Sequence, residues 1–326
     1  MKNIKTIGIL TSGGDAPGMN AAIRAVVRTA IYHSCEVVGV KYGFFGLLNN
    51  LFIPLQSHSV SQKISTGGTF LKSTRCPQFL QPEARAIAYE NIRNQGIDAL
   101  IVVGGNGSFR GADTICKEMG IPVVGIPGTI DNDIYGTDCT IGFDTAVNTA
   151  VRAVDKLRDT ADSHNMVFFV EVMGRDAGFI ALNTSISSGA EATLIPEIPT
   201  TIDQLCNYLE MERRANKTSG IIIVAEGGEH GGAAEIATQV KKRLPQYETR
   251  VTTLGHIQRG GAPTANDRIL GGLLGHDAVV ALINGEKGIM VGRRNDQTVY
   301  TSFEEACSRH CEINKRMVEI AYILSL

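Results

Sequence analysis

Apolar runs alternate with amphipathic stretches along almost the whole chain. The runs are rich in Val and Ile and contain few polar positions, which is typical of parallel strands covered on both faces. The expected strands are Ile4–Leu10, Glu36–Val40, Ala99–Val103, Val123–Ile126, Val167–Val172, Ile221–Ala225 and Arg250–Leu254. The expected helices include Asn20–Tyr32, Pro82–Asn94, Phe143–Asp159, Ile202–Ala215, Ala233–Leu244 and Ala265–Ile283. This alternation predicts an α/β protein.

The length of the chain indicates more than one domain. With 326 residues it exceeds the usual size of a single domain, and no low-complexity segment or obvious linker divides it. We therefore expect two doubly wound Rossmann-like domains with a cleft between them, and an active site in that cleft.

Composition narrows the class of protein. Charged residues make up 20% of the chain and the net charge is −2, which gives no sign of a nucleic-acid or membrane partner. The seven cysteines contain no C-x-x-C pair, which is typical of free thiols in a reducing compartment. No apolar run approaches the length of a membrane span. We expect a cytoplasmic enzyme.

Three Gly-rich loops follow expected strands. They are Thr11–Asn20, Gly104–Ser108 and Pro127–Asp133. Ligands of such sheets bind at the carboxyl ends of the strands, so these loops should lie together. Gly13-Gly14 and Gly104-Gly105-x-Gly107 can present backbone N–H groups before a helix N-terminus, which favours phosphate, although neither fits the Walker or dinucleotide patterns. Any one pair could be a tight turn, but three at one edge favour a phosphate cradle.

Two kinds of charged residue accompany these loops. Asp131 and Asp133 stand two apart just after a strand, where one carboxylate can accept a hydroxyl proton and the other can position Mg²⁺-bound phosphates. Turn-forming or helix-capping roles remain open for both. Arginines recur in other loops, and they suit phosphate because they bind it bidentately. These are Arg75, Arg175, Arg250 and Arg259, with His256 beside the last two.

Several motifs of other enzymes are absent. The sequence has no H-E-x-x-H, no G-x-S-x-G and no Cys/His metal spacing.

The motifs, in their order along the chain, resemble those of the bacterial ATP-dependent 6-phosphofructokinases, from Lys5 to about Gln297. The segments that carry the resemblance are Leu10-Thr-Ser-Gly-Gly-Asp-Ala-Pro-Gly-Met-Asn20, Gly67-Gly-Thr-Phe70, Pro127-Gly-Thr-Ile-Asp-Asn-Asp133, Glu171-Val-Met-Gly-Arg175 and Leu254-Gly-His-Ile-Gln-Arg-Gly-Gly261. Lipid and dinucleotide kinases share a Gly-Gly-x-Gly-Ser/Thr loop, but the segments Pro127–Asp133 and Leu254–Gly261 do not fit those kinases.

The resemblance implies a role for each matching residue. Asp131 would take the proton from the sugar 1-hydroxyl, with Thr129 beside it, and Arg75 would steady the transferring phosphoryl group. The catalytic set is thus Asp131, Thr129, Arg175 and Arg75. The nucleotide contacts would be Gly14, Arg75, Cys76, Gly105, Asn106, Gly107 and Ser108. The contacts to fructose 6-phosphate would be Thr129, Ile130, Asp131, Met173, Gly174, Arg175, Glu226, Arg250, His256, Ile257, Gln258 and Arg259.

The resemblance also implies the organisation of the protein. Residues 1–142 and 256–305 would form the nucleotide-binding domain, and residues 143–255 and 306–326 the domain that binds the sugar phosphate. Members of the family are homotetramers with active sites at subunit interfaces. Glycine at positions 107 and 128 resembles the ATP-dependent enzymes, because pyrophosphate-dependent relatives are expected to carry Asp and Lys there.

Two positions depart from the family pattern. Asn106 stands where the family has an Asp that serves Mg²⁺, so we expect a weakened metal site at Asn106, with Asp133 as a second metal contact. Met166 stands where the family has an interface Arg for the substrate phosphate. Without that contact, we expect the KM for fructose 6-phosphate to be raised.

The effector site of the family, which binds nucleotide or phosphoenolpyruvate, matches in part. The matching positions are Arg24, Arg28, Arg158, Gly189, Glu191 and Lys217. Ser57, Ala215 and Thr218 stand where basic residues would be expected, so the site is depleted of positive charge. We expect weakened or altered allostery.

Two alternatives to an ATP-dependent 6-phosphofructokinase stay open. Asn106 and Met166 would suit a catalytically impaired paralogue that binds sugar phosphate or nucleotide and regulates a partner subunit, although Asp131, Arg175 and Glu226 argue against it. A pyrophosphate-dependent enzyme is disfavoured by Gly107 and Gly128.

Overall fold

The computed structural model describes residues 4–214, 219–228 and 231–325. The chain divides into two compact units, which we describe separately. Unit 1 comprises Met1–Ile130, Ile134–Asp144 and Arg259–Cys311, and unit 2 comprises Asp131–Asp133, Thr145–Gln258 and Glu312–Leu326.

Unit 1 is built on a mainly parallel sheet. Its strands are β1 (Thr6–Thr11), β2 (Glu36–Val40), β3 (Phe52–Leu55), β4 (Ala99–Gly104), β5 (Val123–Thr129), β6 (Ile141–Gly142), β11 (Ile289–Arg294) and β12 (Gln297–Ser302). The order is β12-β11-β5-β4-β1-β2-β3, with β6 paired to β5. The edge strands β3 and β12 run antiparallel to their neighbours.

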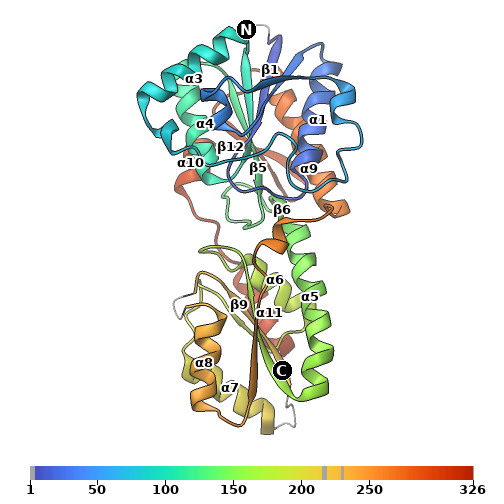
Figure 1. The fold of residues 1–326 in the computed structure, drawn as a ribbon, viewed down its shortest axis with the longest axis vertical. Helices are drawn as coiled ribbons and strands as arrows, with labels where there is room; N and C mark the ends of the chain where they lie inside the picture. The colour runs from blue at the N-terminus through green and yellow to red at the C-terminus, as the bar shows by residue number, and fades with distance from the viewer. Residues whose placement is uncertain (1–3, 215–218, 229–230, 326) are drawn as a thin grey trace. The chain divides into compact units, whose positions relative to one another are not determined.

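Helices cover both faces of this sheet. They are α1 (Met19–Tyr32), α2 (Phe44–Leu48), α3 (Pro82–Asn94), α4 (Asn106–Met119), α9 (Ala265–Ile283) and α10 (Phe303–Ser308), with 3-10 turns η1 (Ser57–Val60) and η2 (Pro77–Leu80). Figure 1 shows α1 and α9 on one side of the sheet and α3 and α4 on the other. The rings of Phe109 and Phe303 stack with centroids 5.5 Å apart, and both side chains are fully or almost fully buried.

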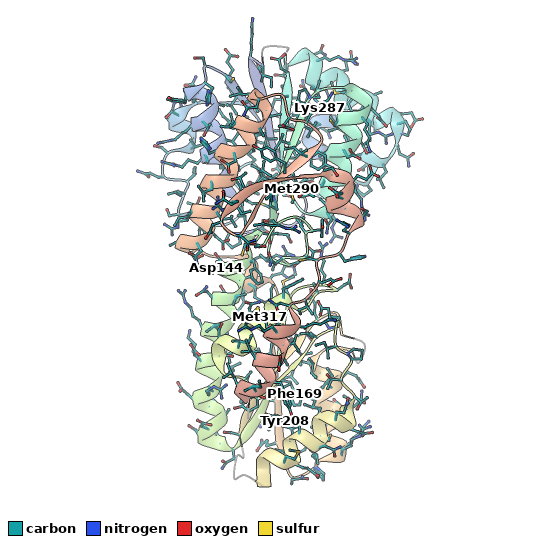
Figure 2. The ribbon with its side chains drawn as sticks, turned by 180° about the vertical axis from the view of Figure 1, so that it is seen from behind. Asp144, Phe169, Tyr208, Lys287, Met290 and Met317 are labelled. Atoms are coloured by element: carbon teal, nitrogen blue, oxygen red, sulfur yellow. The ribbon has the colours of Figure 1, made fainter. Side chains whose placement is uncertain are left out.

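Unit 2 is built on a smaller parallel sheet. Its strands are β7 (Met166–Val172), β8 (Ala192–Leu194), β9 (Gly220–Ala225) and β10 (Glu248–Thr253), in the order β10-β7-β9-β8. The helices are α5 (Phe143–His164), α6 (Phe179–Ser188), α7 (Ile202–Arg214), α8 (Ala233–Arg243) and α11 (Lys315–Ser325), with the 3-10 turn η3 (Gly255–Arg259). Figure 2 labels Met290 in unit 1 and Phe169 in unit 2, and both side chains are fully buried.

The predicted α/β class is confirmed. Helices α3 and α9 and strand β2 have the predicted bounds. The first strand lies slightly later than predicted, at Thr6–Thr11, and α5 continues past the predicted end at Asp159 to His164. The predicted end of α7 at Ala215 lies outside the described residues.

The start of α4 and the last hairpin of unit 1 were not predicted from the pattern. Helix α4 begins at Asn106-Gly107, two poor helix formers, so its first turn reads as loop. The β11–β12 hairpin turns at Asn295 and Asp296, both with positive φ, as a two-residue turn of this kind requires. Among the described residues, no helix combines the length and apolar character needed to span a membrane.

Candidate active site

The sheet of unit 1 reverses its strand order between β1 and β4. The chain passes from β1 to β2 on one side, and β4 pairs with β1 on the other. The ligand crevice of a doubly wound sheet lies at the carboxyl ends of the strands at such a switch point. The loops that follow β1 and β4 flank this point, and both are the predicted Gly-rich loops.

These two loops contact each other closely. The Ser12 backbone N–H donates to the Val103 carbonyl at 2.9 Å. A Cβ on Gly104 would lie 2.6 Å from the Ser12 carbonyl oxygen, so only glycine permits this approach. The neighbouring β5 brings Thr129 close to Gly105, whose Cβ would lie 3.8 Å from that of Thr129. The prediction that the three loops lie together is confirmed.

Helix α4 starts in the middle of this arrangement. Its N-cap is Gly105, so no side chain caps the first turn. The first backbone N–H groups of a helix have no partner within the helix, and the helix dipole places partial positive charge there. This end of α4 can therefore accept a phosphate group.

The two glycines that were expected to distinguish the phosphoryl donor have different surroundings. A Cβ on Gly107 would meet nothing within 4 Å in the described structure. A Cβ on Gly128 would lie 3.0 Å from Val103 Cγ1 and 3.1 Å from Met19 Cε. Gly107 thus leaves open space beside the phosphate-binding helix end, whereas Gly128 accommodates the packing of α1 against the sheet.

Asn20 links the loop after β1 to a second motif segment. Its amide nitrogen donates to the Thr66 and Gly67 carbonyls, each at 3.1 Å, and to the Thr66 hydroxyl at 3.0 Å. Its amide oxygen accepts the Phe70 N–H at 2.9 Å. Because Asn20 is 1% exposed, these bonds organise the 66–70 segment from inside the protein. The pattern of the sequence gave no signal for this pairing, because the partners lie about 46 residues apart.

Unit 1 contains two predicted side chains of the nucleotide site, Arg75 and Cys76, and the predicted sugar-phosphate ligand Arg259. Arg259 Nη1 donates to the Asp15 carbonyl at 3.1 Å, and a Cβ on Gly14 would lie only 2.5 Å from the same nitrogen. The Arg259 guanidinium thus lies against the loop after β1. Arg75 is exposed. Burial raises the pKa of the Cys76 thiol, which favours the neutral thiol over the nucleophilic thiolate.

In unit 2, the carboxyl ends of β10, β7 and β9 lie side by side. The loop after β7 is held by residues from the loops after its two neighbours. Gln258 Oε1 accepts the Met173 N–H at 2.9 Å, and Glu226 Oε1 accepts the Arg175 N–H at 2.9 Å. The Gly174 N–H also points to Glu226 Oε1, at 3.3 Å. Five of the predicted substrate residues are therefore brought into one cluster: Met173, Gly174, Arg175, Glu226 and Gln258.

Arg175 and Asp131 form the charged part of this cluster. Arg175 Nε lies 3.5 Å from Asp131 Oδ2, with the arginine side chain 59% exposed and the aspartate 3% exposed. Arg175 has a φ of 54°, which is unfavourable for a residue with a side chain, so its neighbours must hold it in place. Gly227 permits this conformation, because a Cβ there would lie 1.9 Å from the Arg175 carbonyl oxygen.

Three further predicted substrate residues lie on or beyond the edge strand β10, whereas Thr129 ends β5 of unit 1 and Ile130 follows it. Arg250 belongs to this strand, pairs with Glu248 and donates to the Thr249 carbonyl at 3.1 Å. His256 and Ile257 follow in η3 and are exposed. Met166 begins β7 directly opposite Glu248. Glu171, which the sequence did not single out, accepts the Ala233 N–H at 2.7 Å and so caps α8.

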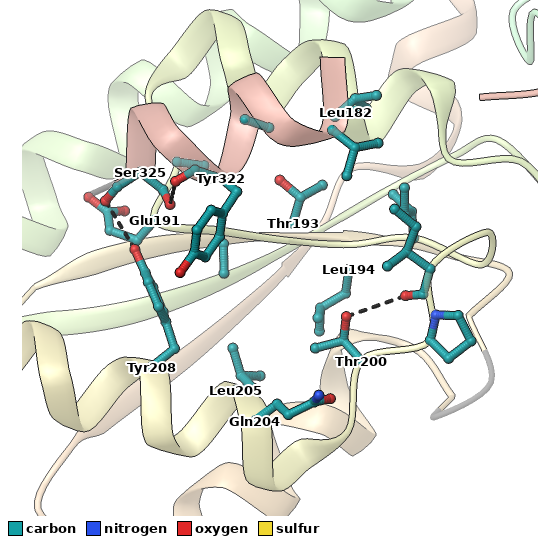
Figure 3. Close-up of a pocket in the computed structure, with 17 residues that line it drawn as sticks. Leu182, Glu191, Thr193, Leu194, Thr200, Gln204, Leu205, Tyr208, Tyr322 and Ser325 are labelled. Atoms are coloured by element: carbon teal, nitrogen blue, oxygen red, sulfur yellow. Dashed lines mark hydrogen bonds between the residues drawn. The ribbon is translucent and has the colours of Figure 1, made fainter. Parts of the chain in front are cut away.

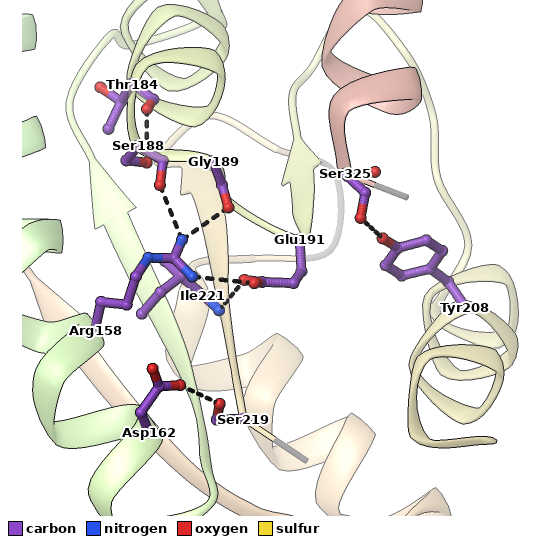
Figure 4. Close-up of polar contacts among 10 residues, drawn as sticks. All are labelled: Arg158, Asp162, Thr184, Ser188, Gly189, Glu191, Tyr208, Ser219, Ile221 and Ser325. Atoms are coloured by element: carbon purple, nitrogen blue, oxygen red, sulfur yellow. Dashed lines mark hydrogen bonds and ion pairs between the residues drawn. The ribbon is translucent and has the colours of Figure 1, made fainter. Parts of the chain in front are cut away.

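The residues predicted for an effector site are divided between the units. Arg24 and Arg28 lie on α1 of unit 1. Arg158, Gly189 and Glu191 meet in unit 2, as Figure 4 shows, where Arg158 Nη1 pairs with Glu191 Oε1 at 3.0 Å. Arg158 Nη2 donates to the Ser188 and Gly189 carbonyls at 2.9 and 2.8 Å. Lys217, Ala215 and Thr218 lie outside the described residues.

Metal ligands are sparse in the described part of the chain, where no group of three or more His, Cys, Asp or Glu residues could hold a metal ion. The predicted metal contacts, Asn106 and Asp133, nevertheless carry oxygen donors. Oxygen donors suit Mg²⁺, which keeps several waters and relies on substrate phosphates as well as on one or two protein ligands.

One unit is doubly wound and has an uncapped helix end at its switch point, and the other presents a buried carboxylate with an arginine; both features are typical of α/β proteins that act on phosphates. Residues 6–282 match the family model described as phosphofructokinase. The chain belongs to the phosphofructokinase family.

Relatives match the chain over its whole length. It is 51% identical over 326 residues to ATP-dependent 6-phosphofructokinase 2 of Bacteroides thetaiotaomicron, covering 100% of both chains. It is 50% identical to ATP-dependent 6-phosphofructokinase 1 of Thermus thermophilus, over 99% of this chain and 100% of that protein. Among solved structures, Pichia pastoris phosphofructokinase in the T-state matches with a TM-score of 0.88 and 35% identity, over 99% of this chain and 39% of that longer one.

Proposed function

We propose that this protein is an ATP-dependent 6-phosphofructokinase, which transfers the γ-phosphoryl group of ATP to the 1-hydroxyl of fructose 6-phosphate. The observation that carries the proposal is the buried Asp131 held beside Arg175 at the strand ends of unit 2. The two relatives named above, about half identical over their full length, support ATP as the donor.

Asp131 acts as the general base. Its carboxylate accepts the proton of the sugar 1-hydroxyl, and the resulting nucleophilic oxygen attacks the γ-phosphorus. The bond between the γ-phosphorus and the bridging oxygen breaks, and ADP leaves with that oxygen. Thr129, two residues earlier in the chain, lies at the end of β5 and supports the sugar beside the base.

Cationic groups stabilise the charge on the phosphates. Arg75 and Arg175 act on the transferring phosphoryl group, because guanidinium groups bind phosphate bidentately. Arg250, His256 and Arg259 bind the 6-phosphate. Glu226 uses Oε1 to hold the loop after β7, which leaves Oε2 as an acceptor for the sugar hydroxyls.

Ile130 and Ile257 have apolar side chains, so their polar contribution to the sugar site would come from their backbone groups. Met173 and Gly174 place their main chain beside the substrate, in the conformation that Gln258 and Glu226 hold. Because Met166 replaces a cation, the protein requires a higher concentration of fructose 6-phosphate than a member of the family with arginine there.

Mg²⁺ would be held by Asn106, Asp133 and the phosphates of ATP. Bound there, the ion would neutralise phosphate charge during transfer. The neutral amide of Asn106 is a poorer ligand for a hard cation than a carboxylate, which predicts a raised Mg²⁺ requirement. The nucleotide itself would be bound by Gly14, Cys76, Gly105, Gly107 and Ser108.

We also propose that the protein works in the cytoplasm as a homotetramer with active sites at subunit interfaces. Family membership supports this assembly, and sedimentation equilibrium tests it, because a mass of one or two chains at the concentration of the assay would contradict it.

Phosphoryl transfer by the purified chain tests the proposed function. Fructose 1,6-bisphosphate formation is measured with ATP or pyrophosphate across a Mg²⁺ titration, for the natural chain and for Asn106→Asp. Turnover with ATP and not with pyrophosphate, and a several-fold lower Mg²⁺ midpoint in Asn106→Asp, are the expected results.

Other outcomes would point to the alternatives. Turnover with pyrophosphate alone would identify a pyrophosphate-dependent enzyme. Absence of turnover with either donor, together with retained binding of both ligands and rescue by Asn106→Asp, would identify a catalytically impaired paralogue.

A further inference from the structure

Unit 2 contains a cavity on the side of β8, away from the loops that bear the proposed catalytic residues. It has a volume of about 350 Å³ and lies between α6, β8, α7 and α11 (Figure 3). Strand β8 is the edge strand opposite to β10. The cavity is therefore separate from the cluster formed by Asp131, Arg175 and Glu226.

The walls of the cavity are largely apolar. Leu182 comes from α6, Leu194 from β8, Leu205 from α7 and Val318 from α11. Pockets that bind small molecules are typically lined in this way, with a few polar groups that orient the ligand. Contact with these four side chains favours a ligand with an apolar surface over a strongly hydrated ligand.

The charge in the lining is already compensated. Glu191 is the carboxylate of the lining, and it pairs with Arg158 at 3.0 Å and accepts the Ile221 N–H at 2.5 Å. The Thr193 hydroxyl bonds to Ser185. A charged ligand would lose its hydration without gaining an opposite charge in the lining, so the cavity suits an uncharged molecule.

Two tyrosines supply ring surfaces and hydroxyl groups. Tyr208 rises from α7, and its hydroxyl donates to the Ser325 carbonyl at 3.0 Å. Figure 3 shows Tyr322 extending from α11 toward α7, on the side of the pocket where Tyr208 lies. A ring-shaped ligand can pack against these tyrosines, and its own hydroxyl can bond to a tyrosine oxygen.

The volume limits the size of the ligand. About 350 Å³ corresponds to roughly ten water-sized volumes, which is enough for one six-membered ring with its substituents. A nucleotide or a sugar bisphosphate is larger and highly charged, and is excluded on both grounds.

We propose that this cavity is a binding site for a small, uncharged, single-ring molecule of phenol type. The ligand would contact β8 and α7 on one side and α11 on the other, and so hold α11 against the unit. Helix α11 is otherwise weakly covered, since Tyr322, Ile323 and Leu324 are 61%, 54% and 62% exposed. This proposal does not depend on the proposed kinase activity.

Fluorine NMR on the full chain tests the site, with 4-fluorophenol as the probe. We expect saturable binding of one probe per chain. The charged isostere 4-fluorobenzoate should bind at least about tenfold more weakly, because nothing in the lining compensates its carboxylate.

Two tryptophan variants on the same helix locate the site. Ala321 lines the cavity, so Ala321→Trp fills it and should weaken 4-fluorophenol binding at least about tenfold. Glu319 is exposed and outside the lining, so Glu319→Trp should leave binding unchanged. If Ala321→Trp does not fold, Val318→Phe narrows the same space with a smaller change.

Three results would overturn the proposal. They are unsaturable binding, equal binding of 4-fluorobenzoate, and unchanged binding in a folded Ala321→Trp or Val318→Phe variant. Kinase activity is measured in parallel, and we expect it to be unchanged in all three variants, so a failure of this site and a failure of the proposed function are distinguishable.

Discussion

Asp131 has the surroundings that a general base in phosphoryl transfer requires. Its side chain is 3% exposed, so water competes little with a substrate hydroxyl, and the Arg175 guanidinium 3.5 Å away keeps a positive charge beside it. Arg175 itself is 59% exposed and remains accessible to phosphate. Asp131 is thus shielded from solvent, whereas Arg175 is accessible to the phosphate of a substrate.

We predict that Asp131→Asn lowers kcat about 10²–10⁴-fold, because the amide has the shape of the carboxylate but accepts no proton at neutral pH. The KM values for both substrates should change little. Steady-state kinetics with ATP and fructose 6-phosphate measure this effect. A kcat within threefold of the natural enzyme would show that another group takes the proton.

Gln258 acts on the substrate site through the backbone. Its side chain is completely buried, and its Oε1 accepts the Met173 N–H at 2.9 Å, so it positions the loop that bears Arg175. The left-handed φ of Arg175 makes this support necessary, since the loop would otherwise relax to a less strained conformation.

We predict that Gln258→Leu raises the KM for fructose 6-phosphate about tenfold, because the Met173 N–H loses its acceptor at a cost of about 1–3 kcal/mol. The KM for ATP should stay the same, since the phosphate-binding loops of unit 1 keep their contacts. Initial-rate kinetics with each substrate varied in turn measure the two constants. An equal increase in the KM values for both substrates, or no increase in either, would contradict a positioning role.

At the scale of elements, side-chain hydrogen bonds attach helices to distant loops and to other helices. The hydrophobic pattern of the sequence does not predict these attachments. Asn20 in the first turn of α1 makes hydrogen bonds that shape the 66–70 segment, and Arg158 of α5 bonds to the last carbonyls of α6. Both attachments join elements far apart in the sequence. Each therefore stabilises the tertiary arrangement more than the local helix.

We predict that Asn20→Ala lowers the free energy of unfolding by about 2 kcal/mol, because it removes the buried amide that bonds the 66–70 segment to α1. Tryptic cleavage after Lys63 or Lys72, which flank the segment, should become faster. Asn49→Ala is the matched control, since Asn49 makes one exposed bond to the Phe45 carbonyl, and it should change stability by less than about 0.5 kcal/mol. Urea unfolding and timed proteolysis give the two readings, and equal behaviour of the variants would rule out the role of Asn20.

At the scale of the whole molecule, regulation depends on the charge of the expected effector site. Arg158 already bonds to Glu191, Ser188 and Gly189, so its guanidinium serves the structure of unit 2. Ser57 stands on η1 of unit 1 where the family has a basic residue. An anionic effector at the expected site would therefore find the Arg158 guanidinium already engaged and no cation at position 57.

We predict that ADP or phosphoenolpyruvate shifts the half-saturating concentration of fructose 6-phosphate by less than about twofold, because each lost charged hydrogen bond weakens anion binding by about 1.5–3 kcal/mol. Ser57→Arg should increase the shift. Saturation curves with and without each effector measure it. A strong shift in the natural chain would refute the expectation of weakened allostery.

Much of the fold followed from local patterns. The Val- and Ile-rich runs predicted parallel strands because a strand buried on both faces is apolar throughout, and α3 and α9 were predicted to the residue. A helix N-terminus was expected at the Gly104–Ser108 loop, but the bounds of α4 were not predicted, because its start at Asn106-Gly107 has low helix propensity and depends on its place at the sheet edge. The roles of the candidate site residues stay predictions, although six of them gather in unit 2: Asp131, Met173, Gly174, Arg175, Glu226 and Gln258.

By itself, the sequence determined the α/β class, the Gly-rich loops at strand ends and membership of the family, because each is encoded in contiguous residues. Only the tertiary structure decided that Gln258 supports Met173, 85 residues away, that Asn20 organises the 66–70 segment, and that a cavity lies beneath α11. The physical reason is that such bonds and spaces depend on strand order and register, and these arise from the packing of the whole chain rather than from any local stretch.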